Sequence, residues 1–367
     1  MMQNHIVDMS EQLARYRALI DKALNTELGV YWTDIKNSNI SAANKEAVQI
    51  LIKFAQNPGK RIRGTLAWYT YEQMAVQSKA ATGVNLAIAM ELIQDYLLII
   101  DDVMDRSEKR RGQPTIHEDY LSRLSKSTTQ GDCLHLANMM AINLGCLSQH
   151  LANSFILNSN EPAENLTKAL KILHDNIKIT CYGQIDDLMS IYSPTVPSAD
   201  IIYSIYHAKS SYYTFINPIQ IGAAIAGHYD EKLMQDIVTF GKPAGLAFQI
   251  KDDILGMFGE SAETGKPNFD DLREGKRTLL ILYAMQMSNP SQQAEIKKHL
   301  GDPKLTESDF MKVREIIEVC GAKEKTEQEA NGNAQQAIKL LRTASTIKPA
   351  MQDFYSAIIE FSVNRKA

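Results

Sequence analysis

Apolar residues recur three and four positions apart along most of the chain, a pattern typical of helices that bury one face. The segment 83–105 shows it most clearly, with Leu86, Ala89, Leu92, Ile93, Leu97 and Ile100 on one face. The same pattern predicts helices at 8–26, 43–56, Gly59 to about Gln77, 83–105, 126–156, 165–190, 197–227, 231–258, 275–287, 306–320, 323–345 and 348–363. No segment of useful length alternates with the period of two that a half-buried strand requires. The sequence therefore predicts an all-α fold.

Connections between the predicted helices are short. Segments 157–164 and 259–275 are interpreted as surface loops, and no Pro- or Ser-rich stretch or internal repeat divides the chain. Apolar residues make up 44% and charged residues 22%, which excludes a disordered chain. Only 19 glycines and 11 prolines occur among 367 residues, which favours long helices. We therefore expect a single domain over 1–367.

Charge and cysteine content narrow the functional class. The chain has 39 basic and 43 acidic residues, whereas a nucleic-acid-binding surface shows a basic excess, so no nucleic-acid partner is expected. The four cysteines form no CxxC pair, which favours a reducing compartment. The N-terminus lacks the pattern of a signal peptide, and the uncharged apolar stretch Tyr96 to Ile100 is too short to span a bilayer. We expect a cytoplasmic protein without a membrane span.

Two aspartate pairs end apolar helical runs: Asp101-Asp102, followed by Asp105, and Asp252-Asp253. Residues four apart share a helix face, so Asp101 and Asp105 point the same way. Negative charges at the end of a buried helix are costly unless cations neutralise them, and Mg²⁺ typically takes one or two carboxylates plus substrate phosphates. A solvated helix end would explain either pair alone. The recurrence of the pair favours a cation cage for a diphosphate.

Basic residues occur where such a cage would need them. Lys60, Arg61 and Arg63 lie between two glycines at a predicted helix start, a place suited to an anion. Arg110 and Arg111 follow the first aspartate cluster. A solvated basic turn would explain the first group alone, so its weight comes from the combined pattern.

In order and spacing, these residues resemble the trans-prenyl diphosphate synthase (polyprenyl synthetase) family. The resemblance runs from about Lys60 to Lys276 and rests on GKRIRG (59–64), DDVMDRSEKRRGQPTIH (101–117), GD (131–132), GQIDD (183–187), Lys209-Ser210, FQIKDDILG (248–256) and GKPNFDDLREGK (265–276). It implies a single-domain helical bundle around a deep central cavity, of the isoprenoid synthase type, and usually a homodimer.

The activity implied by the resemblance is trans head-to-tail chain elongation. An allylic diphosphate of the C5–C15 class ionises, isopentenyl diphosphate attacks the cation, and loss of a proton leaves a chain five carbons longer plus pyrophosphate. Three Mg²⁺ ions are implied as Lewis acids. Matching the family motifs, Asp101 and Asp105 would hold two of them and Asp252 the third.

The resemblance also implies two substrate sites. The allylic diphosphate would contact Arg110, Lys209, Ser210, Gln249, Lys266 and Lys276, and isopentenyl diphosphate would contact Lys60, Arg63, Gln94 and Arg111. Catalysis would depend on Asp101, Asp105, Asp252, Lys209, Ser210 and Gln249, with Ser210, Gln184 and Gln249 aiming oxygen dipoles at the carbocation. Asp102 and Asp253 would support the metal ligands.

Four positions depart from the family pattern. Gly64 stands where many members have proline, with no expected loss of chemistry. Gln94 replaces the commoner histidine and can still donate a hydrogen bond to a diphosphate. Ser210 replaces threonine and keeps the hydroxyl. Gly256 replaces the last aspartate of the second cluster, as in many shorter-chain members, and weakens only the outer support of the third ion.

Three residues before Asp101 bear on product length. Leu97, Tyr96 and Ile93 lie four, five and eight positions earlier, roughly 6 to 12 Å along the helix. In the family, bulk at these positions forms the floor beneath the growing chain. The aromatic Tyr96 resembles that of geranylgeranyl (C20) synthases, with farnesyl (C15) as second choice. Tyr96 could instead simply pack between helices.

Other classes of protein remain open at this point. A class I terpene cyclase has a similar acidic first cluster but needs a second metal motif of Asn/Asp, Ser/Thr and Glu type, and has no need of the 59–64 site. A non-catalytic subunit of a heteromeric synthase usually loses aspartates or basic clamps, and both sets are intact here. A plain helical scaffold predicts no magnesium-dependent ligand binding.

Overall fold

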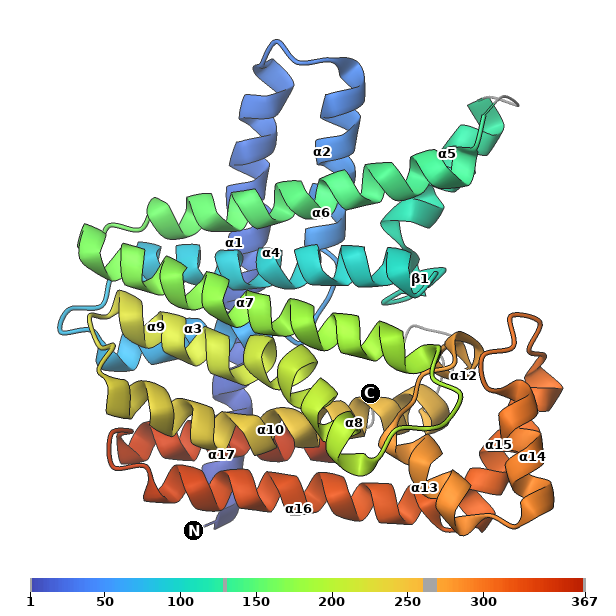
Figure 1. Ribbon diagram of the computed structural model, residues 1–367. Helices are drawn as coiled ribbons and strands as arrows, with labels where there is room; N and C mark the ends of the chain where they lie inside the picture. The colour runs from blue at the N-terminus through green and yellow to red at the C-terminus, as the bar shows by residue number, and fades with distance from the viewer. Residues whose placement is uncertain (1, 128–130, 260–268, 366–367) are drawn as a thin grey trace. The chain divides into compact units, whose positions relative to one another are not determined.

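The computed structural model describes residues 2–127, 131–259 and 269–365, with side chains from residue 11 onward except at residue 127. The described chain is almost entirely helical, and one short hairpin supplies its strands (Figure 1). The prediction of an all-α fold is confirmed.

The elements follow one another in chain order. They are α1 (Met2–Asn37), α2 (Ala42–Ala55), α3 (Ile62–Met74), α4 (Ala80–Met104), β1 (Lys109–Arg110), β2 (Gln113–Pro114), α5 (Ile116–Ser127), α6 (Cys133–Leu157), α7 (Ala163–Ile191), α8 (Ala199–Tyr206), η1 (His207–Ile216), α9 (Asn217–Ile225), α10 (Glu231–Phe258), α12 (Asp270–Glu274), α13 (Leu279–Met287), α14 (Pro290–His299), α15 (Glu307–Val319), α16 (Ala322–Thr343) and α17 (Pro349–Asn364).

Two compact units divide the chain. The first comprises Met1–Lys171 and Pro218–His228, and the second comprises Ile172–Asn217 and Tyr229–Ala367. The helix α7 begins in the first unit and ends in the second. Each unit carries one of the two aspartate pairs, at 101–102 and at 252–253.

The first unit is organised around α4, which packs against α3 and α6, with the α1–α2 hairpin alongside (Figure 1). Its core includes Leu51, Phe54, Ile99 and Leu144, all buried. At Gly145 of α6 a Cβ would lie 3.0 Å from the Ile100 side chain, so glycine permits the close packing of α6 on α4. This packing fixes the apolar helix that leads to Asp101.

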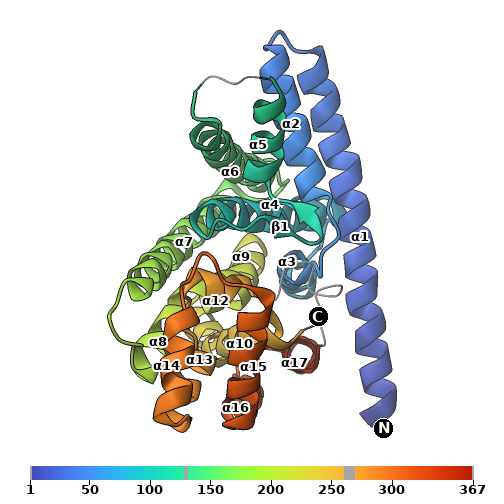
Figure 2. The same cartoon turned by 90° about the vertical axis from the view of Figure 1, so that its right-hand side faces the viewer.

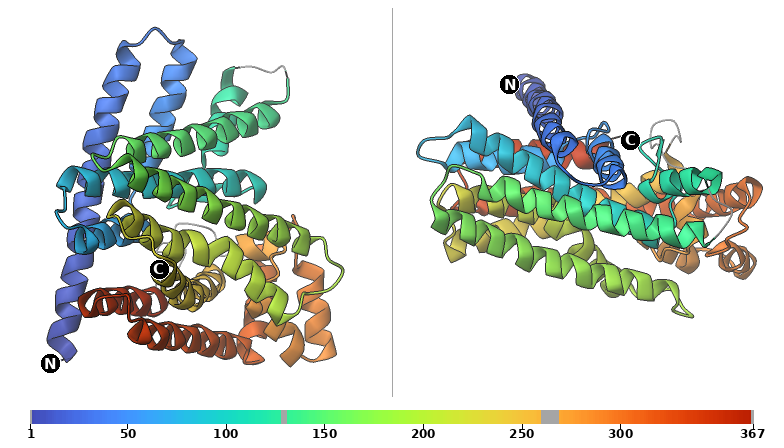
Figure 3. Two further views of the ribbon diagram at one scale, coloured as in Figure 1. Left: turned by 60° about the vertical axis from the view of Figure 1, so that its left-hand side comes forward. Right: turned by 90° about the horizontal axis from the view of Figure 1, so that it is seen from above.

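The second unit is organised around α10, which packs against η1, α16 and α17. The helices α16 and α17 run side by side (Figure 3), and α14 and α15 form an adjacent pair (Figure 2). A Cβ on Gly245 would lie 2.2 Å from the Ser211 backbone, so α10 and η1 approach closely there. The element η1 is a π-helix, a form often found at functional sites, and it contains the predicted site residues Lys209 and Ser210.

Among the described residues, α4 is long and apolar enough to cross a membrane. The uncharged apolar stretch that begins at Tyr96 is short, because Glu91 and Asp95 interrupt the longer apolar run. In the structure 61% of the apolar window is buried, and α4 is the central helix of the first unit's packing. A core helix passes the same test, so this result is weak evidence for a membrane span.

Several predicted boundaries are wrong for local reasons. The helix predicted at 126–156 starts too early, because Asp132 caps α6 by accepting from the His135 N–H at 2.9 Å and α6 begins at Cys133. The predicted helix 197–227 consists of α8, η1 and α9 in succession. The 259–275 loop contains α12 in its described part, and the β1–β2 hairpin, α5 and α14 were not predicted.

Candidate active site

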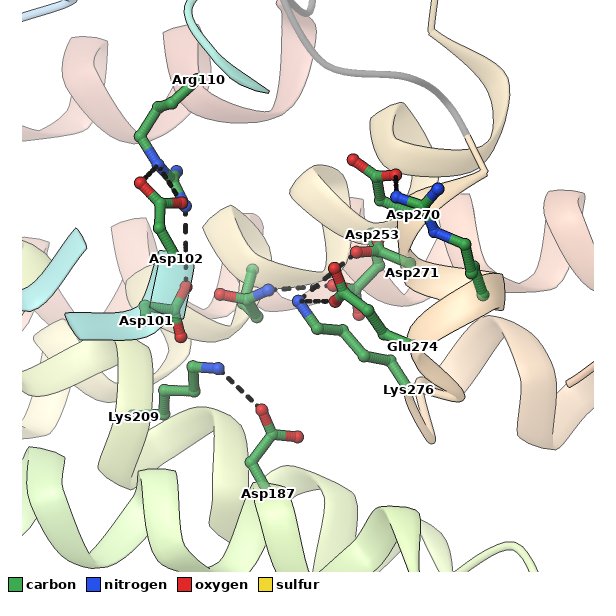
Figure 4. Close-up of polar contacts among 12 residues, drawn as sticks. Asp101, Asp102, Arg110, Asp187, Lys209, Asp253, Asp270, Asp271, Glu274 and Lys276 are labelled. Atoms are coloured by element: carbon green, nitrogen blue, oxygen red, sulfur yellow. Dashed lines mark hydrogen bonds and ion pairs between the residues drawn. The ribbon is translucent and has the colours of Figure 1, made fainter. Parts of the chain in front are cut away.

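The first aspartate cluster ends α4. Asp105 is the residue at the C-terminal cap, and its N–H donates to the Asp101 carbonyl at 2.8 Å. The Asp102 side chain is only 1% exposed and accepts from two nitrogens of Arg110, from Nε to Oδ2 at 2.9 Å and from Nη2 to Oδ1 (Figure 4). Burial alone would lower the pKa of Arg110, but the charge of Asp102 more than offsets it and leaves the pKa raised. Asp102 is therefore paired inside the protein by a permanent cation.

The β1–β2 hairpin sends its two arginines to different places. Arg111 and Gly112 both have positive φ, 53° and 74°, as a type I′ turn requires. Arg110 Nη2 also lies 3.7 Å from Asp101, whereas Arg111 Nη1 donates to the Asn57 carbonyl at 3.4 Å. The turn thus places Arg110 beside the aspartates and its neighbour Arg111 beside the 57–64 segment.

Residues predicted to bind isopentenyl diphosphate gather in part around that segment. A Cβ on Gly59 would lie 3.3 Å from the Arg111 guanidinium, so the segment containing Lys60 is close to Arg111. Arg63 is buried in the first turn of α3, and Gln94 is half-buried on α4. The structure brings Arg111 to the 57–64 segment. Within the described residues, Gln94 forms no hydrogen bond or ion pair with Arg111 or with that segment.

Arg61 differs from its basic neighbours because its contacts are structural. It is 2% exposed and pairs with Asp21 at 2.8 Å and Glu91 at 3.2 Å. It also donates to backbone carbonyls of residues 55 and 57. Glu91 accepts in turn from the Gly64 N–H at 3.0 Å, a bond that proline cannot make, which gives a physical reason for the absence of proline here.

Asp95 is a buried carboxyl that the sequence reading overlooked. It is 1% exposed, and its Oδ2 has no hydrogen-bond partner among the described residues. Burial raises the pKa of Asp95 to about 7, while Arg111 acts in the opposite direction and Glu91 raises it further. In the sequence, the only sign of this buried carboxyl is that Asp95 is a single aspartate within the apolar run that forms α4.

The second aspartate pair, on α10, has a different environment. Tyr206 donates to one oxygen of Asp253, and Gln249 Nε2 donates to the other at 2.9 Å. Burial and the nearby charge of Asp271 raise the pKa of Asp253 to about 8, although both hydrogen bonds lower it. Ser210 donates to the Gln249 oxygen, so the structure joins two predicted site residues. Tyr206 was missed, because 47 residues separate it from Asp253.

Lys209 lies on η1 and faces α7. Its Nζ is 2.7 Å from Asp187 Oδ2 (Figure 4). Gly183 permits this approach, because a Cβ there would lie 2.4 Å from the Lys209 backbone nitrogen. Gln184 is half-buried on the same stretch of α7. The GQIDD segment therefore supplies both a close backbone contact and a counter-ion for Lys209.

Lys276 belongs to an acidic cluster that contacts α10. Its Nζ lies 3.1 Å from Glu274 and 3.5 Å from Asp271 (Figure 4). A Cβ on Gly256 would lie 2.5 Å from an Asp271 oxygen, so the missing last aspartate of the second cluster leaves room for Asp271. Asp271 received no role from the sequence, and Lys266 lies outside the described residues.

The three residues predicted to influence product length line α4 below Asp101. Ile93 is buried, and Tyr96 and Leu97 are half-buried. A Cβ on Gly145 would lie 3.6 Å from the Tyr96 carbonyl, so α6 borders this part of the helix.

The donor set fits a metal that is completed by substrate. Among the described residues, no three His, Cys, Asp or Glu side chains converge as a metal site. Mg²⁺ usually keeps several waters and binds one or two carboxylates plus substrate phosphates. Each aspartate cluster offers one or two carboxylates, which matches this preference of Mg²⁺. A site built by protein ligands alone would need more converging side chains.

Comparisons with known proteins agree with this chemistry. The polyprenyl synthetase family model matches residues 44–318. A geranylfarnesyl diphosphate synthase of Aeropyrum pernix is 31% identical over 310 residues, covering 84% of this chain and 90% of that protein. A geranylgeranyl diphosphate synthase of Sulfolobus acidocaldarius is 30% identical over 286 residues, covering 77% and 80%.

Solved structures give the same result. A geranylgeranyl pyrophosphate synthase of Corynebacterium glutamicum, complexed with isoprenyl diphosphate and magnesium, has a TM-score of 0.88 at 28% identity and covers 96% of this chain and 99% of its own. A polyprenyl synthase of Caulobacter crescentus, complexed with calcium and isoprenyl diphosphate, has a TM-score of 0.77 at 25% identity, covering 97% and 98%. With its motifs, its fold and three quarters of its length in agreement, the chain belongs to the polyprenyl synthetase family.

Proposed function

We propose that this protein is a trans-prenyltransferase that condenses isopentenyl diphosphate with an allylic diphosphate. The observation that carries the proposal is the continuous family match over 44–318, which includes both aspartate pairs and all the predicted basic ligands. The relatives named geranylfarnesyl and geranylgeranyl diphosphate synthase support the same reaction class.

We propose Mg²⁺ as the cofactor, with three ions. Bound Mg²⁺ supplies Lewis-acid stabilisation of the departing diphosphate. Asp101 and Asp105 hold two ions, and Asp252 holds the third. The bidentate contact of Arg110 with Asp102 fixes the end of the first cluster, while Gln249 and Tyr206 orient Asp253 beside Asp252.

The remaining site residues act on the two substrates. Lys60, Arg63, Gln94 and Arg111 bind isopentenyl diphosphate, and Arg110, Lys209, Lys266 and Lys276 bind the allylic diphosphate. The allylic C–O bond breaks and its electron pair leaves with the diphosphate. The double bond of isopentenyl diphosphate then attacks, and a proton is lost.

Ser210 and Gln249 orient dipoles toward the developing cation. The hydrogen bond from Ser210 to the Gln249 oxygen, and that from Gln249 to Asp253, fix the amide orientation. A preorganised dipole stabilises charge without having to reorient during the reaction. The hydrogen bonds that link Ser210, Gln249 and Asp253 therefore support a role for this group in positioning the Gln249 amide during catalysis.

The product is proposed to be geranylgeranyl diphosphate (C20), with farnesyl diphosphate (C15) as the alternative. The half-buried Tyr96 on α4 is the basis of this choice. The relatives include a C25 synthase and C20 synthases, so chain length is the least constrained part of the function.

We also propose a cytoplasmic homodimer without a membrane span, in which residues 1–367 act as one domain. Large apolar side chains are exposed along α6, namely Leu134, Leu136, Met139 and Ile142. An apolar surface of this kind suits a subunit interface. Sedimentation of the wild type and of a Met139→Glu, Ile142→Glu variant tests it: the variant should sediment as a monomer.

The experiment that tests the function is product identification. The protein is incubated with isopentenyl diphosphate, Mg²⁺ and dimethylallyl, geranyl or farnesyl diphosphate, and products are separated by chain length. Linear all-trans diphosphates lengthened by five-carbon steps are expected. Cyclic hydrocarbons would indicate a terpene cyclase, and no turnover with any substrate would indicate a non-catalytic subunit.

A further inference from the structure

The last described residue, Arg365, contacts the proposed ligand of the third metal ion. Its Nη2 lies 2.6 Å from Asp252 Oδ1 and 3.2 Å from the carbonyl oxygen of Phe248, to which it donates. Its guanidinium carbon lies 4.2 Å from the centroid of the Phe248 ring. Three contacts therefore hold this guanidinium on α10, where Asp252 and Phe248 lie 113 and 117 residues earlier in the chain.

The two aspartates of the pair have separate partners. Asp253 is turned to Tyr206 and Gln249, whereas Arg365 is the ion-pair partner of Asp252 within the described chain. The Asp252 side chain is 41% exposed, so an incoming ion can reach it. The Arg365 side chain is 4% exposed, so its charge is largely withdrawn from water.

The buried guanidinium is incompletely satisfied. Its Nε is buried and has no hydrogen-bond acceptor among the described residues. A buried donor without an acceptor loses the hydrogen bond that water would provide. This deficit weakens the Arg365–Asp252 contact relative to a fully bonded arginine fork, which favours its replacement by a stronger cation.

We propose that Arg365 is a built-in counter-ion of Asp252 that a divalent cation must displace in order to bind there. Two cations cannot share one carboxylate without repulsion. Arg365 therefore lowers the affinity of this site for metal and links loading of the ion to release of the residue that follows α17. The inference rests on the proposed function, because that function assigns Asp252 to the third ion.

The test measures metal binding in the presence of inorganic pyrophosphate, which supplies the phosphate oxygens that complete the metal's coordination. Mn²⁺ serves as the probe because it takes the same oxygen ligands and its free concentration is counted by electron paramagnetic resonance. Arg365→Gln removes the charge, and Arg365→Lys retains it. Arg342→Gln is the matched control, since Arg342 forms an exposed ion pair with Asp353 at 2.5 Å between α16 and α17. Asp252→Asn identifies the site.

Arg365→Gln is expected to bind Mn²⁺ at the Asp252-dependent site roughly three- to tenfold more tightly than the wild type, a range reduced for solvent screening. Arg365→Lys should bind nearly as the wild type does, and Arg342→Gln should be unchanged. Equal or weaker binding by Arg365→Gln would overturn the proposal. So would equal gains in the Gln and Lys variants, because a merely structural loosening of α17 would affect both.

The outcome also separates this inference from the function. If Asp252→Asn loses a Mn²⁺ site but Arg365→Gln binds as the wild type does, the inference fails and the metal assignment stands. If Asp252→Asn leaves Mn²⁺ binding unchanged, the assignment of the third ion and the inference both fail. Elongation activity measured on the same wild-type preparation reports on the function independently.

Discussion

The two aspartate pairs are identical in sequence but differ in how the protein holds their second members. Asp102 is buried against the guanidinium of Arg110, a permanent cation. Asp253 is buried against a phenol and an amide, which are neutral, and its pKa is raised to about 8. The first members differ too, because Arg110 approaches Asp101 at 3.7 Å whereas Arg365 pairs with Asp252 at 2.6 Å.

The difference shows that an Asp-Asp pair does not define its own charge state. In the first unit the hairpin places a cation only eight residues after Asp102. In the second unit the partners of Asp253 are Tyr206, the residue before η1, and Gln249, one turn earlier on α10. Local sequence therefore supplies the partner of one buried aspartate, and tertiary packing supplies the partners of the other.

The largest expected effect comes from replacing Asp102, and the same replacement at Asp253, the second aspartate of the other pair, should have a much smaller one. Asp102→Asn leaves the buried Arg110 without its main partner and should destabilise the fold by about 3–5 kcal/mol. Asp253→Asn leaves no buried charge unpaired, so about 1 kcal/mol is expected from the altered hydrogen bonds. Urea unfolding of both variants at pH 7 measures the difference. Equal losses of stability would contradict the contrast between the pairs.

A third buried aspartate, Asp95, sharpens the comparison through pH. Its pKa is raised from 3.8 to about 7, so the folded state favours the protonated form. The stabilisation this gives is complete below pH 3.8 and is lost as the pH rises through 7. Asp95→Asn should therefore stabilise the protein at pH 8 by about 2–4 kcal/mol, with a smaller gain at pH 5.

Urea unfolding at both pH values measures the effect of Asp95→Asn. The exposed Asp34→Asn is the matched control and should change the free energy of unfolding little. A gain of the same size at pH 5 and pH 8 would show that Asp95 is not held in its protonated form.

Much of the fold follows directly from local sequence. The limits of α10 agree with the predicted 231–258 because Asp230 caps its start and Gly259 follows its end. The break before α6 was missed because Gly131 and Asp132, which produce it, were interpreted only as part of a motif. The π-helical turn of η1 could not be predicted, since its register depends on close packing at Gly183 and Gly245.

The candidate site divides in the same way. Asp101, Arg110 and Arg111 lie on one helix end and the next hairpin, so a motif within a dozen residues reveals them. Tyr206, Asp271 and Arg365 meet the second pair from distant parts of the chain. No spacing rule connects such residues, and only the packed structure identifies them.

A smaller effect is expected on the steady-state kinetics when one basic residue is replaced in each unit. Lys60→Ala should raise the KM for isopentenyl diphosphate about tenfold with little change for the allylic substrate, because one charged contact contributes about 1.5–3 kcal/mol when partly buried. Lys209→Ala should mainly reduce kcat, since it assists departure of the allylic diphosphate. Steady-state kinetics with each substrate varied in turn distinguishes them. Proportional changes in both substrates for both variants would refute two separate diphosphate sites.

The smallest effect in energy is on product length. Tyr96→Ala removes an aromatic ring below Asp101 and opens space that an apolar tail can fill, gaining ~25 cal/mol per Å² buried. Products should lengthen by one or more five-carbon units, whereas Leu97→Phe should shorten them. Mass spectrometry of the products provides the measurement. An active Tyr96→Ala variant with unchanged products would place the floor elsewhere, for example on α6.

Elongation with and without metal tests the central claim most directly. Labelled isopentenyl diphosphate and farnesyl diphosphate are given to the wild type and to Asp101→Ala, first after chelation and then with Mg²⁺ restored. The account predicts no product after chelation, full recovery in the wild type with Mg²⁺, and turnover lowered by at least about 10³-fold in Asp101→Ala, equivalent to about 4 kcal/mol of transition-state stabilisation. Chain elongation that persists after chelation, or near-wild-type turnover by Asp101→Ala, would contradict it.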